Sequence, residues 1–420
     1  MTSRSIGPGL SCWAWAMAMA TVCWIPTGQA KETIEPEASQ ETFEIYGTVQ
    51  ADYIQDFDRV DPNWTATLRP SKLAVTSGRF GSDGQAIVSA KQGLFGVTSK
   101  VPVSGEDLIL KFDFDLFGTG DHAGETTFHL QNAYGRWRQI LAGQTDTTFM
   151  DVSIFPDTID YWGPPGMVFV RNPQIRWTPI SGPHSFAVSI ENANTDADVG
   201  NARKIDPGLA RSLQSDNKVP DLSAHYRAEG GWGHFQLAAI VRRLGYDTAA
   251  SPGNNPSGSV TGWGFNLTSN LKSVGDDLAH IGVVYGHGIA SYMNDGGVDL
   301  APECTVVAEA CVPGTVKATA VPLLGVTAYY DHYWSQKFSS AIGYSQTRVD
   351  NQSGQESTAF QSGQYVSANL LWRPAKNILM GAETLWGRLK EYSGKQGDDR
   401  RMQFTVKYKF SEMLMKTNTN

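Results

Sequence analysis

The sequence of 420 residues lacks the features that usually indicate an enzyme or a soluble multidomain protein. It contains no His-Glu-x-x-His, no Gly-x-Ser-x-Gly and no phosphate-binding glycine loop. Its eight histidines are scattered without the spacing of metal ligands. Linkers rich in proline, glycine or serine are missing, and so are convincing helical stretches. We therefore expect one large domain with no catalytic site, no metal and no cofactor.

Long apolar runs are also missing, apart from one at the N-terminus. Arg4 precedes an apolar stretch over residues 10–25, Pro26 ends it, and the small-x-small pattern before a cleavage site ends at Ala30. The run is shorter than the roughly 18 apolar residues that a transmembrane anchor needs. We interpret residues 1–30 as a secretory signal peptide.

Cysteine and positive charge are scarce. The signal peptide carries Cys12 and Cys23, so Cys304 and Cys311 remain, in a segment that proline and glycine interrupt. A single pair in a secreted chain predicts a disulfide, with two free thiols as the alternative. Removal of the signal peptide takes away one basic residue, Arg4, and leaves 33 basic and 42 acidic residues, a formal charge of −9. A chain with this charge is not expected to bind nucleic acid.

Alternation between apolar and polar residues is the dominant pattern. Near the end of the chain, every second residue from Met402 to Phe410 is apolar, and residues such as Gln403 and Lys407 separate them. A period of two places all apolar side chains on one face of a strand. Soluble β-sandwiches and membrane barrels both show this pattern, so alternation alone does not separate them.

The number of strands and the lengths of their connections do separate the two. Short connections follow the even-numbered strands, and mostly longer ones follow the odd-numbered strands, which is typical of an outer-membrane barrel with an even strand number. Alternation and turn signals predict 16 strands, over residues 43–55, 85–100, 106–118, 127–137, 139–149, 167–179, 184–194, 220–230, 233–247, 259–273, 276–293, 316–334, 336–350, 359–374, 376–392 and 398–410.

Tryptophan supports the membrane interpretation, because its ring favours the membrane interface. Five of the nine tryptophans after residue 30 lie beside the short turns: Trp137, Trp177, Trp232, Trp334 and Trp372. We predict an all-β fold: a transmembrane antiparallel barrel with long external loops and short periplasmic turns, preceded by a flexible periplasmic arm. The arm covers residues 31–42, the barrel 43–410 and a C-terminal tail 411–420. A barrel of 16 strands has a lumen too wide for side chains to fill, so the lumen is water-filled.

A family resemblance adds to this interpretation over about 45 residues. Its motifs are Tyr134-Gly135, Leu141-Ala142-Gly143-Gln144-Thr145, Thr148-Phe149-Met150-Asp151, Gly163-Pro164-Pro165-Gly166 and the run from Val168 to Trp177. These resemble the DcaP-like outer-membrane porins of Gram-negative bacteria. The resemblance implies a homotrimeric porin in the lipid of the outer membrane, with a preference for small anionic organic acids. Leu94 and Gln131 depart from the family, whose strands often carry arginine there.

The third long loop, residues 150–166, is the expected constriction of the pore. It combines aromatic residues with three prolines, which restrict the backbone, and an ordinary surface loop is the alternative. Arginine on the facing strands would bind a passing carboxylate, or would instead pair with luminal acids such as Asp113, Asp115 and Glu383. The expected solute path contains Arg171, Arg176, Gln174, Asn172, Asp151, Asp157, Asp160, Gln144 and Arg227.

Two other functions stay open at this point. One is a general porin without selectivity. The other is an outer-membrane barrel hydrolase, which needs a Ser/His pair that no motif in the sequence indicates.

Overall fold

A computed structural model describes residues 41–248 and 256–417; the predicted signal peptide and most of the predicted arm lie outside these residues. The strands of its main sheet are β1 (Glu41–Asp56), β2 (Gln85–Ser89), β3 (Leu94–Val103), β4 (Glu106–Phe117), β5 (Thr126–Trp137), β6 (Ile140–Asp146), β7 (Arg171–Ile180), β8 (His184–Glu191), β9 (Leu213–Ser215), β10 (Asp221–Gly230), β11 (Gly233–Thr248), β12 (Gly258–Lys272), β13 (Leu278–His287), β18 (Pro322–His332), β19 (Phe338–Val349), β20 (Phe360–Ala375), β21 (Ile378–Glu391) and β22 (Gln396–Thr417).

The remaining elements lie in the connections. They are the short strands β14 (Leu300–Glu303), β15 (Val306–Val307), β16 (Ala310–Cys311) and β17 (Lys317–Ala320), the helix α1 (Pro207–Ser212), and the 3-10 turns η1 (Pro62–Trp64), η2 (Pro70–Lys72), η3 (Gly120–His122), η4 (Val152–Ile154), η5 (Gly200–Lys204) and η6 (Ala290–Tyr292). Among the described residues, no helix has the length and apolar character needed to cross a membrane.

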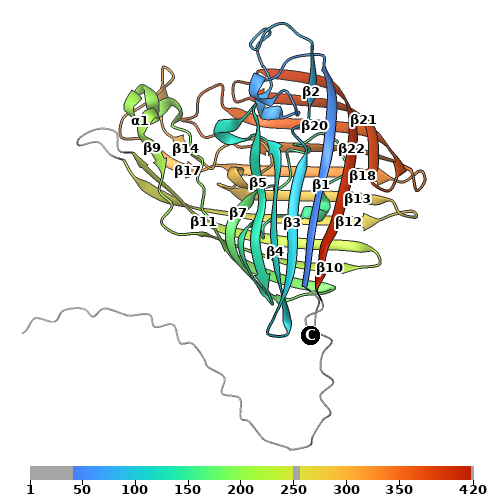
Figure 1. Cartoon of the computed structure of the whole chain (residues 1–420). Helices are drawn as coiled ribbons and strands as arrows, with labels where there is room; N and C mark the ends of the chain where they lie inside the picture. The colour runs from blue at the N-terminus through green and yellow to red at the C-terminus, as the bar shows by residue number, and fades with distance from the viewer. Residues whose placement is uncertain (1–40, 249–255, 418–420) are drawn as a thin grey trace, which may run out of the picture. The chain divides into compact units, whose positions relative to one another are not determined.

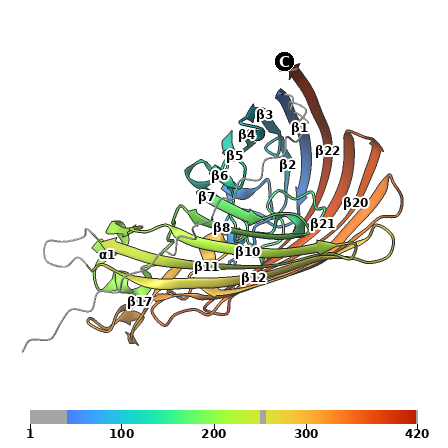
Figure 2. The same cartoon turned by 90° about the horizontal axis from the view of Figure 1, so that it is seen from below.

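The main sheet closes on itself, because β1 pairs antiparallel with β22 along its whole length (Figure 1 and Figure 2). Its 18 strands occupy 16 positions in the wall. β2 and β3 both pair with β1 and share one position, and β9 lies beside β11 in line with β10. The predicted antiparallel barrel of 16 strands is confirmed.

The alternation in sequence becomes two opposite faces of the wall. On β1, Val49 and Tyr53 are 62% and 41% exposed, whereas Gln50 and Asp52 between them are 3% and 2% exposed. Apolar side chains therefore cover the outside and polar ones face the lumen, the reverse of a soluble β protein. This arrangement suits lipid, where a closed barrel leaves no backbone group unpaired.

Short turns close one end of the barrel. Ser104 and Gly105, with φ of 51° and 79°, form the two-residue connection between β3 and β4. Both residues adopt the left-handed conformation that this kind of hairpin requires. The long connections lie at the other end, and residues 57–84 between β1 and β2 are the first of them.

Several predicted boundaries differ from the structure. The strand predicted over 139–149 ends at Asp146, because the chain then turns into the lumen. The strand predicted over 85–100 is interrupted between Ser89 and Leu94 by a turn in which Gly93 N donates to Ala90 O. β22 continues to Thr417, so the boundary at residue 410 falls inside the closing strand.

Candidate functional site

The connection between β6 and β7, residues 147–170, runs inside the barrel, and we call it the inner loop. At its start, Phe149 and Met150 are buried against Ile240 of β11 and Val284 of β13. Further along, its backbone binds side chains of β18, β20, β21 and β22. The inner loop therefore crosses the lumen from one wall to the other.

Asp151 is the first charged anchor of the inner loop. Its carboxylate accepts hydrogen bonds from Arg227 at 3.1 Å, His234 at 2.7 Å and Thr268 at 2.7 Å. Burial acts to raise the pKa of Asp151, but the hydrogen bonds from His234 and Thr268 outweigh it, and the pKa lies below its usual value. Asp151 therefore stays ionised and holds Arg227 in the lumen.

Asp157 and Asp160 anchor the far side of the inner loop. Asp157 forms an ion pair with Arg373 of β20, and its backbone N–H donates to Asp331 Oδ2 at 3.2 Å. Asp160 is 6% exposed and accepts hydrogen bonds from Thr67 Oγ1 at 2.8 Å and from other groups around it. Burial raises the pKa of Asp160. Asp160 therefore holds the loop in place instead of contacting a passing solute.

Several anchors of the inner loop were not assigned this role from sequence. Glu383 accepts hydrogen bonds from the backbone N–H groups of Ile159 and Asp160, both at 3.1 Å. Arg373 and Thr67 were missed altogether. Strand parity could have placed Arg373 in the lumen, but no sequence signal places Thr67 beside the loop.

An arginine joins the inner loop to the long connection 57–84. The Arg69 guanidinium lies 4.1 Å from the ring centroids of both Trp64 and Trp162. It also donates to Asp295 at 3.0 and 2.8 Å, and that carboxylate accepts hydrogen bonds from the backbone and side chain of Ser71. We call these five residues the arginine clamp; they come from three separate connections.

The cations predicted for the solute path differ in their partners. Arg227 pairs with Asp151, and Arg171 pairs with Asp146 at 3.0 Å. Arg176 instead donates to two neutral acceptors, Gln174 Oε1 at 3.0 Å and the backbone carbonyl of Asp146. Among the residues that the structure describes, no carboxylate lies within ion-pair distance of Arg176.

The remaining predicted path residues separate into two groups. Asn172 and Gln174 are buried on the luminal face of β7, and Asn172 donates to Tyr292 at 3.3 Å. Gln144 pairs across the sheet with Pro173, which is exposed on the outer face, and its side chain donates to Leu130 O. Because side chains alternate between faces, Gln144 does not join the luminal group.

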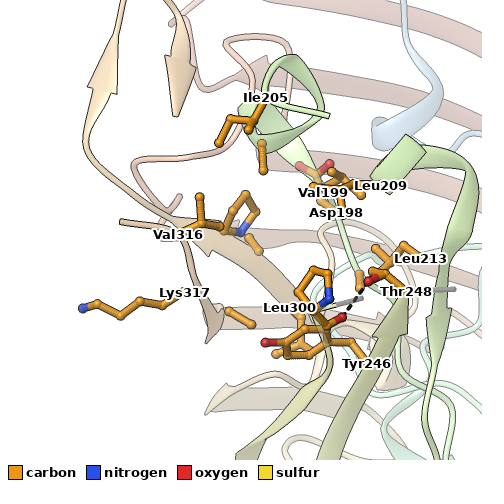
Figure 3. A pocket seen from close by; sticks show the side chains of 16 residues that line it. Asp198, Val199, Ile205, Leu209, Leu213, Tyr246, Thr248, Leu300, Val316 and Lys317 are labelled. Atoms are coloured by element: carbon orange, nitrogen blue, oxygen red, sulfur yellow. Dashed lines mark hydrogen bonds between the residues drawn. The ribbon is translucent and has the colours of Figure 1, made fainter. Parts of the chain in front are cut away.

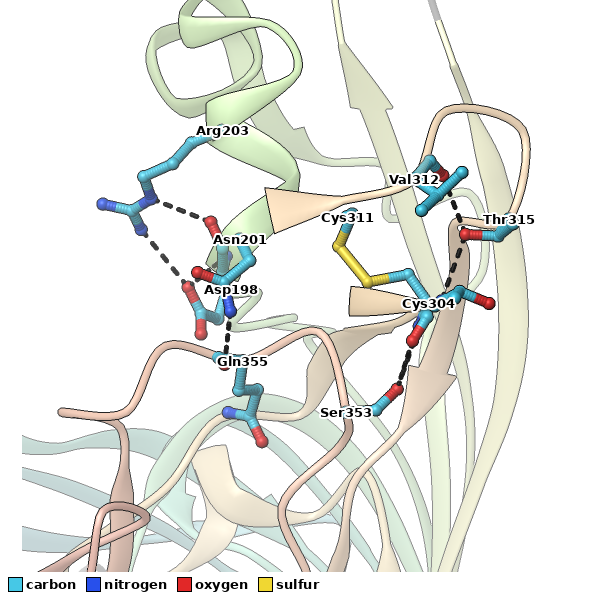
Figure 4. Close-up of a disulfide and its surroundings, with 11 residues drawn as sticks. Asp198, Asn201, Arg203, Cys304, Cys311, Val312, Thr315, Ser353 and Gln355 are labelled. Carbon is cyan, nitrogen blue, oxygen red and sulfur yellow. Dashed lines mark hydrogen bonds and ion pairs between the residues drawn. A yellow bond between two sulfur atoms is a disulfide. The ribbon is translucent and has the colours of Figure 1, made fainter. Parts of the chain in front are cut away.

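The remaining cysteines form the predicted disulfide between Cys304 and Cys311 (Figure 4). It closes a small hairpin in the long connection between β13 and β18. Ser353 binds the backbone of Cys304 and so joins this hairpin to the connection between β19 and β20.

The same loop region holds an apolar pocket (Figure 3). Its lining includes Val199, Ile205, Leu209, Tyr246 and Leu300. None of these residues belongs to the inner loop, and the apolar lining offers little to a hydrophilic solute. The pocket is therefore separate from the solute path.

Known proteins share this architecture. A family model described as DcaP outer membrane protein matches residues 26–225. The outer membrane channel DcaP of Acinetobacter baumannii superposes with a TM-score of 0.73 at 20% identity, covering 88% of this chain and 97% of that chain. OmpT of Vibrio cholerae superposes with a TM-score of 0.52 at 10% identity, covering 90% of this chain and 100% of that chain.

An anion-selective porin from Comamonas acidovorans gives a TM-score of 0.52 at 8% identity, covering 88% of this chain and 100% of that chain. Curated proteins give no significant match. At these identities the solved structures show the shared fold. The closed barrel of 16 strands and its inner loop are those of an outer-membrane porin barrel, and the family match over residues 26–225 makes this chain similar to the DcaP outer membrane proteins.

Proposed function

We propose that this porin is a passive diffusion channel that favours small anionic organic acids. In this proposal the inner loop narrows the lumen, and solutes pass between it and the facing wall. The residues proposed for the solute path are Arg176, Arg171, Arg227, Asn172, Gln174, Asp151 and Asp157.

The observation that carries the anion preference is the contrast between Arg176 and the other luminal arginines. Arg227 and Arg373 each pair with an aspartate of the inner loop, so their charges are largely compensated. Arg176 donates hydrogen bonds only to neutral acceptors among the described residues. The carboxylates whose charges act on it, Glu191 and Asp146, form no ion pair with it, so its guanidinium can still bind an anion. A carboxylate that passes in the narrow, partly dehydrated lumen gains charged hydrogen bonds from such a guanidinium.

We also propose that the porin is a homotrimer in which each barrel carries its own channel. One solved form of OmpT of Vibrio cholerae, described as a trimer, supports this through the shared fold, with a TM-score of 0.52 at 12% identity. Conductance steps in multiples of three in planar bilayers would agree with it.

Reversal potentials across planar bilayers under a salt gradient test the selectivity. We expect the wild-type porin to prefer anions, and Arg176→Glu to shift the permeability ratio toward cations by about fivefold or more. That figure corresponds to roughly 1 kcal/mol between unit charges about 4 Å apart in water. Arg79→Glu makes the same charge change in the exposed part of the connection 57–84; it is the matched control and should change the ratio little.

An equal permeability to both ions in the wild type, or an unchanged ratio in Arg176→Glu, would contradict the anion preference. The porin would then be a general, non-selective channel.

A further inference from the structure

The outer face of the barrel carries a groove over β20, β21 and β22. Its lining includes the small side chains of Ala368 and Thr384 and the large ones of Phe57, Trp386 and Met402. The strand residues among these occupy outward positions, because their chain neighbours are the buried luminal residues. The groove therefore faces the membrane and not the channel.

Cationic side chains follow the groove toward the end with long loops. Arg388 and Lys390 are the next two outward positions of β21 after Trp386. Arg400 of β22 pairs with Trp386 across the sheet and also lines the groove. The apolar groove thus leads directly into a cationic surface on the same strands.

The partners of these cations leave them available to an anion. Arg388 pairs with Asp398 at 2.6 Å and Arg400 with Asp58 at 3.4 Å, but both arginines are well exposed, at 38% and 67%. The long, exposed pair of Arg400 contributes little, so a phosphate can replace it. Arg388 holds Asp398 through two hydrogen bonds, and its exposed part can still contact a phosphate. In the part of the chain that the structure describes, Lys390 has no carboxylate within ion-pair distance.

The depth of these cations in the membrane follows from the strand geometry. Trp372 lies at the end with short turns, and Gln364 lies eight residues along β20, where it pairs with Arg388. Eight residues of a tilted strand span about 20 Å along the membrane normal, close to the height of the apolar band of an outer-membrane barrel. Arg388 and Lys390 therefore lie at the level of the external head groups.

We propose that this face binds lipid A, the phosphorylated glycolipid of the external leaflet. An acyl chain lies in the groove over Ala368 and Thr384, and the phosphates bind Lys390, Arg388 and Arg400. Charge favours this occupant, because cations that border an apolar groove match a molecule that carries both phosphates and acyl chains. The proposal is independent of the selectivity of the channel.

Binding of bisphosphorylated lipid A to the detergent-extracted full-length porin tests this site, with native mass spectrometry as the readout. We expect Lys390→Gln to weaken binding about tenfold, the loss of one charged contact. Ala368→Trp, which fills the groove, should weaken binding by at least as much. The matched control is Arg243→Gln, which removes an outward arginine of β11 that pairs with Asp216 at 3.2 Å, and it should leave binding unchanged.

Every variant is first checked for a heat-modifiable folded barrel and for unchanged conductance. Equal affinity of the wild type and both site variants would overturn the proposal. So would equal affinity for lipid A without phosphates, or equal competition by phosphatidylglycerol. Loss of the oligomer in Ala368→Trp with unchanged lipid binding would also overturn it, and would assign the groove to a contact between copies of the chain.

Discussion

At the scale of single residues, the acids of the inner loop serve two purposes that their sequence positions do not distinguish. Asp151 orders three groups of the wall and compensates Arg227. Asp160 is enclosed and only anchors the loop. The same residue type is therefore the partner of a luminal arginine in one place and an enclosed anchor of the loop in the other, depending on which groups face it.

Replacing Asp151 by Asn should lower the free energy of unfolding by about 1–3 kcal/mol, because a buried charged hydrogen-bond partner is lost. It should also leave Arg227 with Glu229, at 3.1 Å, as its remaining carboxylate partner, and so raise the anion preference. Thermal unfolding of the detergent-extracted protein measures the first effect and reversal potentials measure the second. Asp83→Asn, in the exposed part of the connection 57–84, is the matched control.

The same substitution predicts a change in pH dependence. The folded state holds the pKa of Asp151 below its usual value of about 4. The stability that this ionised group contributes is therefore present above about pH 4 and is lost as the pH falls through the lowered pKa. Between pH 7 and pH 2 the wild type should lose more stability than Asp151→Asn. Parallel losses in both proteins would count against this role of Asp151.

At the scale of elements, the inner loop owes its position to other connections as much as to the barrel wall. The arginine clamp joins it to the connection 57–84, and the rings of Phe117 and Tyr161 stack beside the clamp at 3.9 Å. The loop runs inside the barrel, and its role as the constriction of the pore stays a prediction. Its far anchors were not predictable, because Ile159 and Glu383 are separated by 224 residues and only the closed barrel brings them together.

Arg69→Ala should loosen the inner loop, because it leaves the buried carboxylate of Asp295 without its cation and separates two tryptophan rings. Removal of one partner from a buried ion pair lowers the free energy of unfolding by about 3–5 kcal/mol. We expect larger and noisier single-channel conductance in planar bilayers. Arg79→Ala, in the same connection but exposed, should conduct like the wild type; equal conductance of all three proteins would exclude a role for the clamp.

At the scale of the whole molecule, closure of the barrel depends on the pairing of β1 with β22. Ten register pairs join Gly47–Asp56 of β1 to Arg401–Phe410 of β22, and we call them the main seam. Further pairs join the start of β1, before Gly47, to the end of β22, after Phe410. The register shifts once, between Phe43 and Glu44, among these further pairs. The main seam is therefore regular, and the irregularity lies outside it.

Truncation after Phe410 should leave the barrel closed, because the ten pairs of the main seam persist. We expect unchanged conductance and a heat-modifiable band, together with faster hydrogen exchange of the backbone at residues 42–46, which lose their partners on β22. Failure to form a conducting barrel would show that the further pairs are needed for assembly.

The sequence by itself determined the strands, their two faces, the strand number and the short turns, because alternation and turn chemistry are local properties of the chain. It also favoured the disulfide pair, since only two cysteines lie beyond the predicted signal peptide, but it left two free thiols as an alternative. Tertiary structure alone decided which groups meet inside the lumen: Arg373 with Asp157, Thr67 with Asp160, and Arg176 with neutral acceptors. The physical reason is that closure of the barrel and the inward turn of one loop set these distances. Both bring together residues that are far apart in the sequence, so local sequence patterns do not reveal them.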